Sequence, residues 1–247
     1  MKKNAPIIMF LAMFVSLMFS SCVAFAKEIK GDGNLITKTV SISKFSKIEI
    51  ETNVEVNFSQ APNKGSLEFT VDKNLWDFYD IYTQNEILYI KLKDPKEKDR
   101  PSPTKGLIVV SSEKLEEIEM AGSSVFNFCT AFTAEKLSVD LAGSCKINAN
   151  KFPVTIEECI FDMAGSCQVY LKGTVQQAEI DLAGSGSVKA LDCKFDKLSV
   201  EIAGSGSVEA YVAKKLDVEI AGSGVVSYKG NPQVSSDIAG SGKVKKL

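Results

Sequence analysis

The amino-acid sequence predicts an all-β protein that folds as a right-handed, single-stranded β-helix, a β-solenoid in which successive turns of the chain stack as rungs. Two observations predict this fold class. The tripeptide Ala-Gly-Ser occurs seven times, beginning at residues 121, 142, 164, 183, 203, 221 and 239, and a period near 20 residues is typical of solenoids. The residue before each copy and the residue five places after its alanine are large and apolar in all seven, so stacked copies would build a continuous core.

Each copy lies between two short segments of alternating apolar and polar residues, as in 198–202 and 207–210. This alternation predicts a strand, a tight Ala-Gly-Ser-Gly turn and a second strand, because glycine suits a sharp corner. An antiparallel meander of hairpins shares the alternation, but it gives no reason for one tripeptide to recur at every second turn. We therefore expect residues 121–247 to form a regular repeat of seven rungs with two main sheets.

The chain begins with a segment that is typical of export. Lys2 and Lys3 precede a nearly continuous apolar run over residues 6–19, and Ala24-Phe25-Ala26 is a good cleavage site, which predicts a signal peptide over residues 1–26. Alternatively, residues 1–21 are a lipoprotein signal and Cys22 is lipidated. Both alternatives place the protein in the periplasm, the outer membrane or at the cell surface, with membrane attachment only through the lipid anchor.

Residues 27–120 are less regular, and we expect them to form the irregular first rungs and the cap of the same single domain. Residues 48–56 resemble one rung, with Thr52-Asn53 at its turn. Further strands are expected at 67–71, 87–92 and 107–110. The charged stretch 93–105 holds three prolines and is expected to be an exposed loop.

The composition excludes several classes of function. The chain has no histidine, and Arg100 is its only arginine, which removes Ser-His-Asp and Cys-His catalysis and histidine-ligated metals. The net charge of −2 argues against a nucleic-acid partner. We expect no catalytic residues and no cofactor.

Three groups of residues are candidate sites. The first is an acidic column two places before each Ala-Gly-Ser, which either binds cations, with calcium favoured, or is a solvated charged face. The second is an aromatic segment, Trp76, Tyr79 and Tyr82, which either stacks on a sugar or packs over the open end of the coil. The third is Cys145 and Cys167, equivalent positions in adjacent rungs, which are either a disulfide or two free thiols. The acidic column consists of Glu119, Asp140, Asp162, Asp181, Glu201, Glu219 and Asp237.

The chain resembles the head GIN domain family of autotransporter adhesins from Gram-negative, Bacteroides-type bacteria. The residues that carry the resemblance are Gly31-Asp32-Gly33-Asn34, Phe45 to Ile50 with Val54-Glu55-Val56, the segments 75–81 and 85–90, and the Gly-Ser-Gly repeats. The resemblance covers about residues 31–247. It implies a right-handed, pectin-lyase-like β-helix and a role in adhesion at the cell surface.

The function expected from these features is non-enzymatic binding of host or envelope glycans or proteins through a rigid rod. One alternative is a β-helix polysaccharide lyase or glycosidase, since carboxylate pairs can perform acid–base chemistry. Another is a structural envelope protein that self-associates as a homo-oligomer through the solenoid ends.

Overall fold

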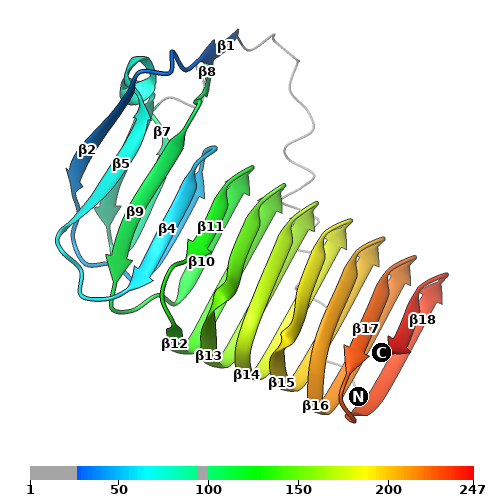
Figure 1. The fold of residues 1–247 in the computed structure, drawn as a ribbon. Coiled ribbons are helices and arrows are strands. Elements are labelled where there is room, and N and C mark those ends of the chain that lie inside the picture. The colour runs from blue at the N-terminus through cyan, green and yellow to red at the C-terminus, as the bar shows by residue number, and fades with distance from the viewer. Residues whose placement is uncertain (1–26, 94–98) are drawn as a thin grey trace.

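A computed structural model describes residues 27–93 and 99–247 and confirms the predicted β-solenoid (Figure 1). The predicted signal peptide and Cys22 lie outside the described residues. In the first half the elements are β1 (Lys27–Lys30), β2 (Leu35–Ser41), β3 (Lys47–Glu51), β4 (Glu55–Gln60), β5 (Ser66–Asp72), the 3-10 helix η1 (Lys73–Phe78), β6 (Tyr79–Gln84), β7 (Ile87–Leu92), β8 (Asp99–Ser102) and β9 (Gly106–Ser112). They are followed by β10 (Glu117–Gly122), β11 (Val125–Phe128), β12 (Phe132–Gly143), β13 (Lys146–Gly165), β14 (Gln168–Gly184), β15 (Ser187–Gly204), β16 (Ser207–Gly222), β17 (Val225–Lys229), β18 (Gln233–Gly240) and β19 (Lys243–Lys246).

The seven Ala-Gly-Ser copies stack in register. Strands β10, β12, β13, β14, β15, β16 and β18 pair in parallel in that order, and the alanine of each copy lies opposite the alanine of the next. The apolar residues before each copy therefore form one inward column. This stacking is the arrangement that the repeat predicted, and it rules out the antiparallel meander for residues 117–247.

The glycine of the repeat is required by the close approach of adjacent turns. Gly184 has a φ of +121°, and a Cβ at this position would lie 2.6 Å from the carbonyl oxygen of Gly165 in the preceding rung. The Ser185 N–H donates a 2.9 Å hydrogen bond to that same oxygen. Because a side chain would collide with the backbone that accepts this bond, only glycine fits the corner.

The first rungs do not follow sequence order. Strands β3 and β4 form the predicted rung at residues 48–56, but β7 and β9 pair on one side of it and β10 and β11 on the other. The rung formed by β3 and β4 therefore lies between the cap strands that follow it in sequence and the first Ala-Gly-Ser rung. In the cap, β2 pairs with β5, β5 with β9 and β6 with β7, all antiparallel.

The prediction of a loop throughout residues 93–105 was wrong in part. Residues Asp99–Ser102 form β8, which pairs in parallel with β1 in a separate two-stranded sheet, and Pro101 is buried. The partner strand at Lys27–Lys30 is distant in the sequence, so the local proline content gave no sign of this pairing. Residues 94–98 lie outside the described part.

Asp72, a fully buried carboxylate at the end of β5, ties the cap together. It accepts hydrogen bonds from the Gly33 N–H at 2.7 Å, the Thr104 N–H at 2.8 Å and the Thr104 hydroxyl at 2.8 Å. Burial acts to raise the pKa of Asp72, but the bonds from Thr104 and Gly33 outweigh it and hold the pKa below its usual value.

Candidate functional site

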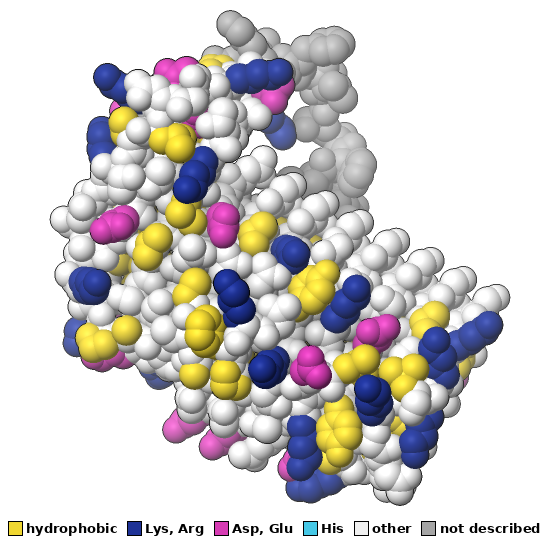
Figure 2. Space-filling view, viewed as in Figure 1, with side chains coloured by type: hydrophobic (Ala, Val, Ile, Leu, Met, Phe, Trp, Pro, Cys, Tyr) yellow, Lys and Arg dark blue, Asp and Glu magenta, His cyan; other side chains and the backbone are white. Residues whose placement is uncertain are grey.

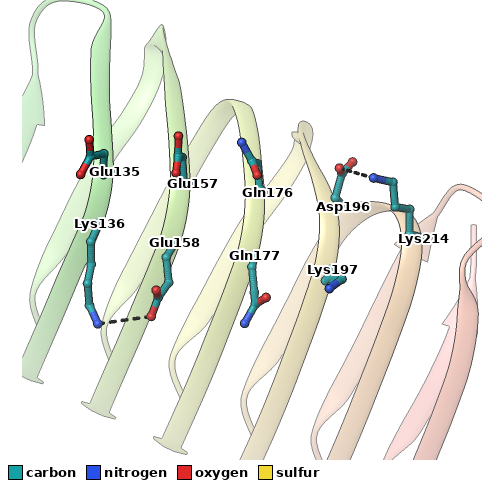
Figure 3. Close-up of a pocket in the computed structure, with 9 residues that line it drawn as sticks. All are labelled: Glu135, Lys136, Glu157, Glu158, Gln176, Gln177, Asp196, Lys197 and Lys214. Carbon is teal, nitrogen blue, oxygen red and sulfur yellow. Dashed lines mark hydrogen bonds and ion pairs between the residues drawn. The ribbon is translucent and has the colours of Figure 1, made fainter.

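A polar groove with a volume of about 580 Å³ runs across successive rungs on the outside of the solenoid (Figure 3). It lies where each rung turns a corner. In β14, Val175 and Ala178 are both buried, so the two residues between them, Gln176 and Gln177, face outward. The equivalent pairs of the neighbouring rungs line up beside them. The lining consists of Glu135, Lys136, Glu157, Glu158, Gln176, Gln177, Asp196, Lys197 and Lys214.

Charge is distributed unevenly along the groove. Lys136 pairs with Glu158 at 3.2 Å and Lys214 pairs with Asp196 at 2.7 Å, while the two glutamines lie between these ion pairs (Figure 3). The hydrogen bond from Lys214 lowers the pKa of Asp196. Every lining side chain is charged or an amide, so the groove can exchange hydrogen bonds with a polar ligand but offers no apolar anchor.

The acidic column lies on the same outer face, four residues further along each strand, about 13 Å from the second row of the groove at the usual rise of a strand. The register adds one member that the repeat did not predict, since Glu49 of β3 pairs with Glu119. The carboxylates therefore extend beyond the Ala-Gly-Ser copies.

Crowding in this column disfavours ionisation. Partial burial, followed by repulsion from neighbouring carboxylates, raises the pKa of Asp140 to about 6 and that of Asp181 to about 7. Partial burial and a hydrogen bond with Glu117 raise the pKa of Glu119 to about 7. Carboxyl oxygens of Glu117, Glu119 and Asp140 lie within 4.8 Å of one another. Whether the column binds cations stays a prediction.

The three residues of the predicted aromatic site lie in two different clusters. Trp76 and Tyr79 both pack on Phe69, with ring centroids 5.6 and 4.9 Å away, and Tyr79 is only 5% exposed. Tyr82 instead stacks on Tyr89 of the neighbouring strand at 5.0 Å. The three residues therefore do not form one platform, and a sugar-binding role for them stays a prediction.

The two cysteines of the third candidate are adjacent, as predicted. Cys145 and Cys167 occupy equivalent places after Ala-Gly-Ser, in rungs joined by the pairing of Lys146 with Gln168. Both are fully buried and both are free thiols in this structure.

Two features were missed by sequence reasoning. Asn57, Asn127 and Asn148 form a ladder whose side chains are linked by 2.8 Å hydrogen bonds. This ladder could have been predicted from the sequence, because aligning the rungs places the three asparagines at the same position in the strand after the turn. The groove was missed because its residues differ from rung to rung. Elsewhere on the surface, the face in Figure 2 shows lysines interspersed with apolar and acidic side chains rather than a patch of one sign.

Comparison with known proteins agrees with this architecture. Residues 44–232 match the family model described as "putative auto-transporter adhesin, head GIN domain". The crystal structure of a protein from Parabacteroides distasonis named a putative lipid binding protein is 28% identical with a TM-score of 0.76, and the match covers 90% of this chain and all of the other. A protein from Bacteroides fragilis named a putative adhesin is 21% identical with a TM-score of 0.80, covering 89% of this chain and all of the other, and shows the fold alone. No curated protein matches the chain.

Within the described residues, no helix is long and apolar enough to cross a membrane. The family model spans 189 of the 247 residues, from β3 to the loop before β18, and so includes the rungs that carry the groove. The chain therefore belongs to the family described as "putative auto-transporter adhesin, head GIN domain".

Proposed function

We propose that the mature chain is an exported, non-enzymatic binding protein of the cell surface that holds a glycan in the polar groove. The observation that carries this proposal is the composition of the groove. Its nine lining side chains are all carboxylates, amides or ammonium groups, and these are the partners that sugar hydroxyl and acetamido groups require.

The same lining argues against other ligands. Protein-binding sites are usually centred on buried aromatic or apolar anchors, and a lipid chain needs an apolar cavity. The groove supplies neither. The name of the Parabacteroides relative therefore gives no reason to expect a lipid in this groove.

Binding without cleavage is favoured by the ion pairs that two of the groove carboxylates make. A glycosidase needs a general acid whose pKa is raised, whereas the pKa of Asp196 is lowered by its bond to Lys214. Glu158 is held in an ion pair with Lys136. The carboxylates with raised pKa belong to the acidic column, which lies outside the groove.

A glycan array tests the proposal. The double variant Gln176→Ala/Gln177→Ala removes the central amides, while Gln168→Ala removes an exposed glutamine from the same strand at a position outside the groove. We expect the wild type and Gln168→Ala to bind a shared set of glycans and the double variant to lose at least tenfold in affinity. Unchanged binding by the double variant would overturn the groove as the site, and new reducing ends in a bound glycan would overturn the non-enzymatic assignment.

Protease treatment of intact cells tests the location. A tag inserted at Lys64, an exposed residue between β4 and β5, should be digested on intact cells while a periplasmic control protein survives. Protection of the tag until lysis would rule out the cell surface and direct the search to partners in the periplasm.

A further inference from the structure

The fourth position of each tight turn points into the solenoid. Across the seven copies it is Ser124, Cys145, Cys167 and then glycine at 186, 206, 224 and 242. Ser124, Cys145 and Cys167 are fully buried. Two thiols thus follow one another in a column where a side chain occurs in only three rungs.

The glycines show how little space the later turns leave at this position. A Cβ at Gly206 would lie 2.3 Å from a methyl carbon of Leu182, and a Cβ at Gly224 would lie 2.7 Å from one of Ile202. In those rungs the apolar residue of the preceding rung fills the space beneath the turn. At Cys145 and Cys167, by contrast, a buried side chain occupies this position in two adjacent rungs.

The backbone places the two cysteines within bonding range. Cys145 accepts the Gln168 N–H at its carbonyl with a 2.9 Å hydrogen bond, so the two turns are locked at the spacing of paired strands, about 4.8 Å. Disulfides span Cα separations of about 4.4–6.8 Å. The interaction between the two thiols, followed by burial, raises the pKa of Cys145, and the same interaction lowers the pKa of Cys167.

We propose that Cys145 and Cys167 form a disulfide that staples two adjacent rungs of the solenoid. One cysteine thiolate attacks the disulfide of an oxidant, either glutathione disulfide or an oxidised dithiol oxidoreductase, and releases one thiolate. The second cysteine then attacks the mixed disulfide and releases the other. The chain loses two protons and two electrons, and the oxidant's disulfide is reduced to two thiols.

The staple forms while the rungs assemble, not afterwards. Both sulfurs are inaccessible in the folded solenoid, so a disulfide reagent in solution cannot reach either of them. The reduced, folded protein should therefore resist oxidation, whereas refolding protein should cross-link. Formation in the cell rests on the proposed export, because a reducing cytosol keeps thiols free, but pairing in vitro does not depend on export.

The experiment has two arms, both read by peptide mapping without reduction after thiols are blocked. In the first, the purified chain is refolded in a mixture of reduced and oxidised glutathione, and we expect a peptide pair that links Cys145 to Cys167. The linked form should melt about 5–10 °C above its reduced form. This difference should vanish in Cys145→Ser and Cys167→Ser, a substitution that the serine at 124 shows the column accepts. It should persist in Cys159→Ala, which removes a buried thiol outside the pair.

Free Cys145 and Cys167 after oxidative refolding, or a link to another cysteine, would overturn the proposal. In the second arm the chain is isolated from cells with immediate blocking of thiols. Cross-linking there supports both the staple and export. Free thiols from cells combined with linkage in vitro would overturn formation of the staple in the cell and count against export, while leaving the pairing itself intact.

Discussion

Replacing Asp181 with asparagine should stabilise the protein, and increasingly so as the pH rises. The side chain lies in the middle of the acidic column, and one of its oxygens, Oδ1, is buried without a hydrogen-bond partner. Burial, then repulsion from Glu201, Glu179 and Asp162, raises its pKa from 3.8 to about 7. The folded state thus binds this proton more tightly than the unfolded chain does, so the wild type loses stability as the pH rises from about 4 to about 7. Asparagine does not titrate.

The size of the effect follows from the pKa. A rise from 3.8 to about 7 corresponds to an upper limit of about 4 kcal/mol. Because Asp181 is only half-buried, solvent screening reduces this to about 1–2 kcal/mol. In a chain of this length each kcal/mol shifts Tm by about 2–4 °C, so Asp181→Asn should melt about 2–8 °C above the wild type at pH 8 and show less than half of that gain at pH 5.

Thermal unfolding between pH 4 and pH 8 measures this difference. The matched control is Asp237→Asn, the same substitution in the same column at the last rung, where the side chain is exposed. We expect little change in Tm for the control at any pH. The reasoning is refuted if the gain for Asp181→Asn is the same at pH 5 and pH 8, or if Asp237→Asn gains as much.

Three further predictions concern stability. Gly184→Ala should lower the free energy of unfolding by about 2–4 kcal/mol, because the new Cβ combines a positive φ with a collision against Gly165. The control Gly33→Ala, whose Cβ would meet no atom within 4 Å, should lower it by only about 1 kcal/mol in the same denaturant titration. Asp72→Ala should cost about 2–3 kcal/mol by leaving the donors at Gly33 and Thr104 unpaired; since the pKa of Asp72 is lowered by folding, its contribution should be present above about pH 4 and disappear from the wild type as the pH falls further. Sodium chloride should raise the wild-type Tm at pH 8 by screening the acidic column, and calcium at equal ionic strength should do no more; an additional calcium-dependent rise that Glu119→Gln abolishes would show a cation site.

The regular half of the fold was predictable because each local signal in it agrees with the global arrangement. Ala183 stacks on Ala164 and Ala203, so the same tripeptide meets the same steric constraint in every rung. The alternation then fixes which residues face the core. The first half carries similar strand signals at residues 87–92 and 107–110, but a strand pattern does not specify its neighbours. Nothing local to β7 or β9 indicates that they lie on the far side of β3 and β4.

The groove could not be predicted for a different reason. Its position depends on the corner at which two successive residues face outward. The number of residues between an Ala-Gly-Ser turn and the next such corner differs from rung to rung. The register shifts between Ala190 and Lys194, for example, so counting forward from an Ala-Gly-Ser copy does not align the corner residues. Counting back from the next copy does align them, seven and six places before its alanine, but their residue types differ from rung to rung, so no motif marks them. The aromatic segment shows the same limit, because Tyr82 pairs with Tyr89 across a hairpin while Tyr79 turns inward.

The groove and the acidic column also differ in how far their pattern of residues, from rung to rung, allows a ligand to be bound at one defined position. In a solenoid, a residue type that recurs in every rung reflects a structural requirement that all rungs share. A ligand cannot distinguish one position of such a uniform column from the next. The acidic column is uniform in sign. Partial burial and repulsion raise the pKa of Asp140 and Asp181, so ionisation of these two groups opposes folding. A charged face of this kind keeps flat sheet surfaces from packing together. The groove varies instead from rung to rung: Glu157 and Glu158 are both acidic, Gln176 and Gln177 are both amides, and the neighbouring rungs on either side combine an acid with a lysine. A sequence that varies along the axis can fix both the position and the direction of a bound chain, which is why we place recognition in the groove rather than in the column.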